Sequence, residues 1–310
     1  MLQISIKKQE DLHISKIYSN FAAQNCLRMA KIGVFDSGYG GLTILEAIRK
    51  ELPQYDYLYL GDNARAPYGT HSFDVIYRYT LEAVKYLFAH DCALVILACN
   101  TASAKALRTI QQRDLPEINH QLQITNHQSR RVNVLGVIRP TVEAVPALTM
   151  TRHIGILGTP ATVSSESYVM ELEKIDSSLV ITQQSCPLWV PLIENNEHNT
   201  PGAKFFIEKY LDELLAKDHL IDTIVLGCTH YPLIKKQIDH YLGDKITTIA
   251  QGELEAKSLA DYLSRHPEYR SQLSANGTCH FLTTENADRF SQSASLFLSS
   301  PVQAEHIDLE

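Results

Sequence analysis

The stretch Cys92-Ala93-Leu94-Val95-Ile96-Leu97-Ala98-Cys99-Asn100-Thr101-Ala102-Ser103 decides the expected fold. Its first six residues form an unbroken apolar run, which is typical of a parallel strand buried on both faces. Helix-forming residues follow over 104–108, so Cys99 stands where a strand ends and a helix begins. In open α/β sheets ligands bind at that edge. The positive end of the helix dipole there also favours a thiolate.

The same pattern returns later in the chain. A strand-like segment over 222–226, apolar from Ile224 on, is followed by Gly227-Cys228-Thr229-His230, and a second helical segment begins near Pro232. Proline is tolerated in the first turn of a helix. Two cysteines in the same local setting indicate two related halves that face one another, and a chemistry that uses a matched pair of thiols.

Composition narrows the class of protein. The chain has 310 residues, 45% of them hydrophobic and 20% charged, as in a soluble globular protein of about two domains. Its net charge of −7 argues against a mainly electrostatic nucleic-acid binder. No segment reaches the roughly 18 apolar residues of a membrane span. The six cysteines contain no C-x-x-C pair, so a zinc site is not expected. A chain of this length does not need disulfides, so we expect it to reside in a reducing cytoplasm.

The first 30 residues form a leader of their own. They lack the unbroken apolar core of a signal peptide, and Met29 lies just before the first clear strand. We expect this leader to be loosely ordered or not translated.

Strand-like and helix-like segments alternate through the rest of the chain, which predicts doubly wound parallel sheets, one in each half. Two segments interrupt the alternation. Residues 111–131 are polar and rich in turn formers, so we expect an exposed loop and hinge. Residues 186–194 are expected to form an apolar loop that ends in Glu194, either as an oriented acid or as a surface group.

Polar residues at strand ends suggest a site. Asp36 ends the first strand at the same sheet edge as Cys99. Its carboxylate either caps a helix or belongs to the site. The glycine-rich turn over 37–41 lacks G-x-G-x-x-G spacing, so it predicts backbone approach to a small anion, not a nucleotide. In the loop after the second strand, Tyr68 and Gly69 could offer a hydroxyl and a backbone amide to a ligand.

These segments together resemble the glutamate racemase family, in the family's order and over residues 31–310. The blocks that carry the resemblance are Asp36-Ser37-Gly38, Gly61-Asp62-Asn63-Ala64-Arg65-Ala66-Pro67-Tyr68-Gly69, Ala98-Cys99-Asn100-Thr101-Ala102, Gly136-Val137-Ile138-Arg139-Pro140, Gly155-Ile156-Leu157-Gly158-Thr159, Cys186-Pro187-Leu188-Trp189-Val190-Pro191-Leu192 and Gly227-Cys228-Thr229-His230-Tyr231-Pro232-Leu233.

The resemblance implies an enzyme that interconverts L- and D-glutamate without a cofactor or metal and supplies D-glutamate for peptidoglycan. One thiol removes the Cα proton from one face while the other delivers a proton to the opposite face. By resemblance these residues are Cys99, assisted by Asp36, and Cys228, assisted by His230, with Glu194 near the second thiol. The implied substrate contacts are Asp36, Ser37, Tyr68, Gly69, Asn100, Thr101, Thr229 and His230.

The resemblance also implies a homodimer and a division into two domains, residues 31–125 plus 246–310 and residues 126–245. After Ile249 the chain reads Ala250-Gln251-Gly252-Glu253, where many relatives have an Asp-Ser-Gly type sequence. Two other functions stay open from the sequence: an aspartate racemase or another two-cysteine racemase, and an amino-acid-binding protein with inert thiols.

Overall fold

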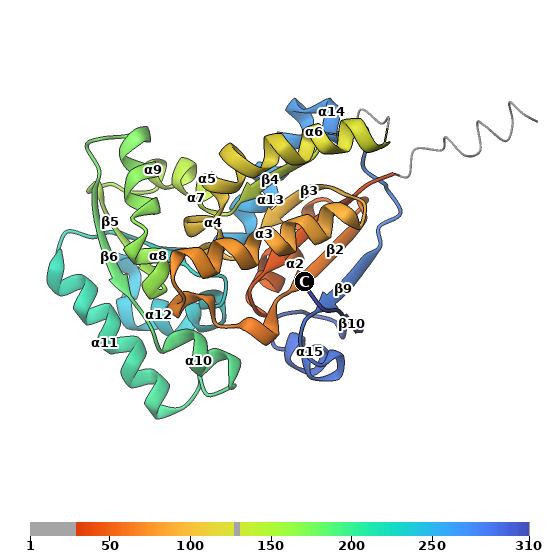
Figure 1. Ribbon diagram of the computed structural model, residues 1–310. Coiled ribbons are helices and arrows are strands. Elements are labelled where there is room, and N and C mark those ends of the chain that lie inside the picture. Colours follow the sequence, from red (N-terminus) through yellow and green to blue (C-terminus); the bar gives the residue numbers. More distant parts are fainter. Residues whose placement is uncertain (1–28, 127–130, 310) are drawn as a thin grey trace, which may run out of the picture.

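Two parallel sheets form the framework of the protein. The computed structural model describes residues 29–126 and 131–309 (Figure 1), so the expected leader lies almost entirely outside the described residues. One sheet has six strands in the order β10-β9-β2-β1-β3-β4, and the other has four in the order β6-β5-β7-β8. The strands are β1 (Lys31–Asp36), β2 (Tyr57–Gly61), β3 (Cys92–Leu97), β4 (Asn133–Gly136), β5 (His153–Gly158), β6 (Val180–Ser185), β7 (Thr223–Gly227), β8 (Thr247–Ile249), β9 (Cys279–Thr283) and β10 (Ala304–His306).

Strand register brings the chemistry-bearing residues to one edge in each sheet. Every pair of neighbouring strands is parallel, as expected from the alternation of strands and helices. In the first sheet Phe35 pairs with Leu97, so Asp36, the last residue of β1, and Cys99, two residues beyond β3, lie at the same edge. In the second sheet Gly158 pairs with Gly227, which places Cys228 at the corresponding edge.

Helices cover the sheets, and α11 packs against β6 at the left of Figure 1. Short 3-10 turns join several of them. The helices are α2 (Gly41–Glu51), α3 (Phe73–Ala89), α4 (Asn100–Lys105), α5 (Leu107–Thr109), α6 (Leu115–Asn126), α7 (Ile138–Ala144), α8 (Pro160–Ser164), α9 (Ser167–Ile175), α10 (Trp189–Glu194), α11 (Pro201–Lys217), α12 (Lys235–Leu242), α13 (Gly252–Arg265), α14 (Pro267–Arg270) and α15 (Ala287–Ala294).

The prediction of a loop over residues 111–131 is wrong for most of that range. The chain makes one wide helical turn at Ile110–Asp114 and continues as α6 to Asn126. The physical reason is a sparse apolar stripe: Leu115, Ile118 and Leu122 recur at helical spacing and pack against the core beneath. Residues 127–130 lie outside the described part of the chain.

The apolar loop expected over residues 186–194 is also partly wrong, because its second half is the short helix α10. Pro191 lies in the first turn, where backbone N–H groups have no partner within the helix and a proline costs little. Trp189 and Ile193 of this helix are buried. The helix therefore carries Glu194 at its C-terminal end.

Strand pairing differs from the expected domain boundaries at two points. β4 pairs with β3, so residues 133–136 belong to the first sheet, although the boundary at 125 had placed them in the second domain. β8 pairs with β7, so residues 247–249 belong to the second sheet, beyond the boundary at 245. The two crossings of the chain therefore lie just after β4 and just after β8.

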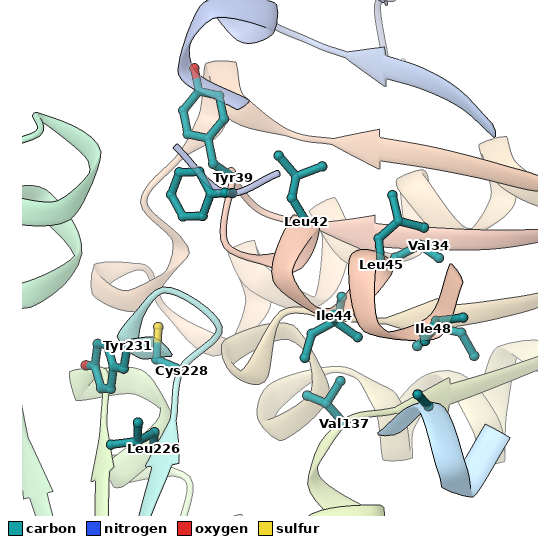
Figure 2. Packing of buried hydrophobic residues seen from close by; sticks show 14 of the residues in the cluster. Val34, Tyr39, Leu42, Ile44, Leu45, Ile48, Val137, Leu226, Cys228 and Tyr231 are labelled. Atoms are coloured by element: carbon teal, nitrogen blue, oxygen red, sulfur yellow. The ribbon is translucent and has the colours of Figure 1, made fainter. Parts of the chain in front are cut away.

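The main hydrophobic cluster extends across both halves. Figure 2 shows Ile44 and Ile48 of α2 in the same cluster as Leu226 of β7 and Tyr231, which follows that strand. Helix α13, which follows β8, packs closely on α2. Among the described residues, no helix is both long and apolar enough to cross a membrane.

Candidate active site

A small cavity lies between the two halves, and its wall contains every site residue expected from the sequence. The cavity has a volume of about 70 Å³. A single water needs about 10–15 Å³ of such space, so the cavity suits a small ligand and not a nucleotide. The expected residues that line it are Asp36, Ser37, Tyr68, Gly69, Cys99, Asn100, Thr101, Glu194, Cys228, Thr229 and His230.

Cys99 is the N-cap residue of α4. Its sulfur accepts a hydrogen bond from the backbone N–H of Ala102 at 3.4 Å and lies 3.2 Å from the hydroxyl oxygen of Ser37. The side chain is 6% exposed. Burial raises the pKa of the Cys99 thiol to about 12, with a further contribution from the nearby charge of Asp36. Cys99 is therefore a protonated thiol near neutral pH.

Asp36 lies at the end of β1 and is almost completely buried. Its Oδ2 accepts a hydrogen bond of 2.8 Å from the N–H of Gly38, whereas its Oδ1 has no partner within the described part of the chain. Burial raises the pKa of this carboxyl, although the charge of His230 opposes the shift. Asp36 makes no hydrogen bond to Cys99 and influences it through its charge.

Cys228, His230 and Glu194 form a chain of three groups. The Cys228 sulfur lies 3.8 Å from His230 Nδ1, and His230 Nε2 lies 2.8 Å from Glu194 Oε1. Burial disfavours the charged imidazole, but the hydrogen bonds and charges of Cys228 and Glu194 outweigh it and raise the pKa of His230 well above 6.5. His230 is therefore an imidazolium at neutral pH, held between a sulfur and a carboxylate.

The glycine-rich turn was expected to approach a small anion, and it instead approaches side chains of the second half. A Cβ on Gly40 would lie 2.4 Å from both His230 Nδ1 and Thr229 Oγ1, and one on Gly38 would lie 2.9 Å from Glu194 Oε1. Such distances leave no space for a side chain. The two glycines therefore let the loop after β1 come into contact with the Cys228 side of the cavity.

Three side chains expected to bind a ligand have hydrogen-bond partners within the protein. The Tyr68 hydroxyl donates a short hydrogen bond to Asp62. The Asn100 amide is bonded on both its nitrogen and its oxygen. The Thr101 hydroxyl lies 2.9 Å from that of Thr159 in the second half.

Sequence reasoning missed some of the wall. Thr159 caps α8, accepting a hydrogen bond from the Thr162 N–H, and it also lines the cavity. A signal in the sequence could have indicated this position. Thr159 follows the last glycine of β5 just as Cys228 follows the last glycine of β7. Cys186 is buried, as expected of a small apolar residue, but it too lines the cavity.

The cavity wall has few formal charges. Among the described residues that line it there is no lysine or arginine, and His230 is the charged donor. In the described ranges, no group of three or more His, Cys, Asp and Glu side chains is arranged to hold a metal ion. A larger hollow of about 670 Å³, lined in part by Lys105 and Glu255, contains neither thiol of the cavity.

Comparison with known proteins places the chain in a family. Residues 42–254 match the model of the Asp/Glu/hydantoin racemase family. A glutamate racemase from a Ruegeria species is 38% identical over 284 residues, covering 88% of this chain and 98% of its own.

Solved structures agree with this match. A glutamate racemase isoform from Bacillus anthracis has a TM-score of 0.79 at 31% identity, covering 91% of this chain and 98% of its own. Glutamate racemase from Francisella tularensis, solved in complex with D-glutamate, has a TM-score of 0.78 at 30% identity, covering 92% and 99%. With two thiols facing one small cavity and these likenesses over most of its length, the chain belongs to the Asp/Glu/hydantoin racemase family and, within it, to the glutamate racemases.

Proposed function

We propose that this protein interconverts L- and D-glutamate by proton transfer between two cysteines and the substrate's Cα. One observation carries the proposal: Cys99 and Cys228, from different halves, line the same small cavity. A racemase must reach both faces of one carbon atom. A cleft with one thiol on each wall meets that requirement, and membership of the glutamate racemases identifies the substrate.

The two cysteines have different surroundings. Cys99 begins as the thiol, because burial and the charge of Asp36 hold its proton. Cys228 acts as the base in this direction, with His230 Nδ1 facing its sulfur and Glu194 fixing the ring. When Cys228 takes the Cα proton, Cys99 gives its own proton to the opposite face. The enantiomer is then formed, and the reverse reaction exchanges the two roles.

The cavity must also stabilise the carbanion that forms when Cα loses its proton. Both thiols are buried, so little water competes with hydrogen bonds to the substrate. The backbone N–H groups at the start of α4 and the Thr229 hydroxyl would hold carboxylate oxygens. The unpaired Oδ1 of Asp36 would accept a hydrogen bond from the substrate's ammonium group.

The test is deuterium exchange at Cα of L-glutamate in heavy water with the purified protein. We expect deuterium to enter Cα and D-glutamate to accumulate. An inert amino-acid-binding protein would give no exchange. L-Aspartate in a parallel sample separates glutamate racemase from an aspartate racemase, because only the latter exchanges aspartate at a comparable rate.

Two substitutions test the roles of the thiols. Cys99→Ser and Cys228→Ser each keep the size of the side chain and remove the acid/base group, so each should lower kcat by about 10²–10⁴-fold. Cys279→Ser, in β9 and outside the cavity wall, is the matched control and should keep wild-type turnover. Full activity in Cys99→Ser would remove the mechanism.

The remaining expectations are proposals of the same family origin: a homodimer, a cytoplasmic location and a supply of D-glutamate to peptidoglycan. The cysteines within the described residues form no disulfide with one another, which suits a reducing compartment. Light scattering on the purified protein measures the oligomer. Complementation of a D-glutamate-requiring bacterial strain tests the supply of D-glutamate.

A further inference from the structure

Gln251 closes a buried ring of hydrogen bonds behind Cys99. Gln251 is 3% exposed and stands between β8 and α13. Its Oε1 accepts a hydrogen bond of 2.7 Å from Asn100 Nδ2, and its Nε2 donates one of 3.0 Å to the Tyr168 hydroxyl. That hydroxyl donates in turn to Asn100 Oδ1 at 2.7 Å. Each polar side-chain atom of the ring therefore has at least one hydrogen-bond partner.

The ring is anchored outside itself. The second N–H of the Gln251 amide faces the Val137 carbonyl at 3.0 Å and Thr141 Oγ1 at 2.9 Å. Thr141 uses its own hydroxyl proton on the Val137 carbonyl. Gln251 thus connects α4, α7 and α9 at a point where water is excluded, and a satisfied buried network of this kind stabilises one arrangement of its members.

Asn100 is the member of the ring that matters for chemistry. It is the first residue of α4 and follows Cys99 directly, and that helix has only six residues. Its Oδ1 and one N–H of its amide are occupied by Tyr168 and Gln251, so the ring fixes the orientation of this side chain. What the ring controls is the position of the first helical turn, where the Ala102 N–H holds the Cys99 sulfur.

We propose that Gln251 is a positioning residue for racemisation: through Asn100 it holds the first turn of α4, and with it the Cys99 sulfur, at the distance needed for proton transfer. The inference rests on the proposed two-thiol function. Proton transfer is sensitive to small displacements, and an error of about 1 Å can cost about 10²-fold in rate.

The test uses two variants that open the ring at different points with little change in volume. Gln251→Met removes the amide, and Tyr168→Phe removes only the hydroxyl. The matched control is Tyr262→Phe, which removes a hydroxyl of α13 that accepts a 2.8 Å hydrogen bond from Asn133. Each protein is assayed for kcat, KM, thermal unfolding and the primary isotope effect with Cα-deuterated glutamate.

We expect kcat to fall by about 30- to 100-fold in both ring variants, with KM within about threefold of wild type and a larger isotope effect, because proton transfer becomes slower than binding and release. The control should match wild type in all four measurements. A purely structural role would lower thermal stability and the yield of folded protein without changing the isotope effect.

Either of two results overturns the inference while leaving the proposed function intact: wild-type kcat in a folded ring variant, or a loss of kcat with an unchanged isotope effect. A wild-type protein that shows no exchange at Cα overturns the proposed function and this inference together. If Gln251→Met does not fold, Tyr168→Phe decides alone, because it deletes one oxygen atom and no carbon.

Discussion

Because of Glu255, the free energy of unfolding should fall as the pH rises. This residue lies on α13 and is 2% exposed, and its Oε2 has no hydrogen-bond partner among the described residues. Burial raises the pKa of Glu255 from 4.5 to about 8. At neutral pH the folded protein therefore keeps this carboxyl protonated, whereas the unfolded chain ionises it.

The magnitude follows from linkage between folding and proton binding. Between pH 4.5 and 8 the folded state holds one proton that the unfolded state has released, so the free energy of unfolding falls by about 1.4 kcal/mol per pH unit from this group alone. From pH 5.5 to 7.5 the loss is about 3 kcal/mol. Below pH 4.5 the stabilisation is fully present, and above pH 8 it is gone.

The perturbation is Glu255→Gln, which keeps the shape of the side chain and cannot ionise. Urea unfolding at pH 5.5 and 7.5 gives the free energy of unfolding for the variant and the wild type. Other titrating groups cancel in the difference, so the variant should gain about 3 kcal/mol relative to wild type as the pH rises. The control, Glu253→Gln, changes an exposed carboxyl on the same helix and should leave the difference within about 0.5 kcal/mol. Parallel pH slopes for wild type and Glu255→Gln would refute the reasoning.

The remaining predictions concern His230 and its contacts. Glu194→Gln removes the charge that favours the His230 imidazolium, so the pKa of His230 should fall. The alkaline limb of the pH–rate profile should therefore move to lower pH. An unchanged pH–rate profile would contradict this. In the wild-type protein the His230–Glu194 pair stabilises the folded state. This stabilisation is fully present below pH 6.5 and is lost as the pH rises through the raised pKa of His230. Thermal unfolding measured over a range of pH tests this. Gly40→Ala should lower kcat and reduce the free energy of unfolding in urea by about 1–3 kcal/mol, because the new methyl overlaps His230 and Thr229. The control, Gly202→Ala, has space for the methyl and should leave stability unchanged or raise it.

The sequence predicted the parts of the fold that depend on local periodicity. Buried parallel strands read as unbroken apolar runs, and the residue after each run lies at the sheet edge whatever the rest of the chain does. That is why Cys99, Asp36 and Cys228 could be assigned to one kind of edge before the structure was seen. The same local logic failed for α6, where three apolar residues among many polar ones are enough to hold a helix on the core.

The tertiary structure alone decided which distant groups meet. Gly40 lies against His230 of the second half, and Gln251 reaches Asn100 across 151 positions of the chain. Glu255 is buried, and one of its oxygens has no partner among the described residues. No local pattern encodes such contacts, because they depend on how the two sheets pack against each other. By itself the sequence determined that two thiols stand at strand ends. The packing of the halves brought those ends to one cavity, and burial there set the charge of the groups around them.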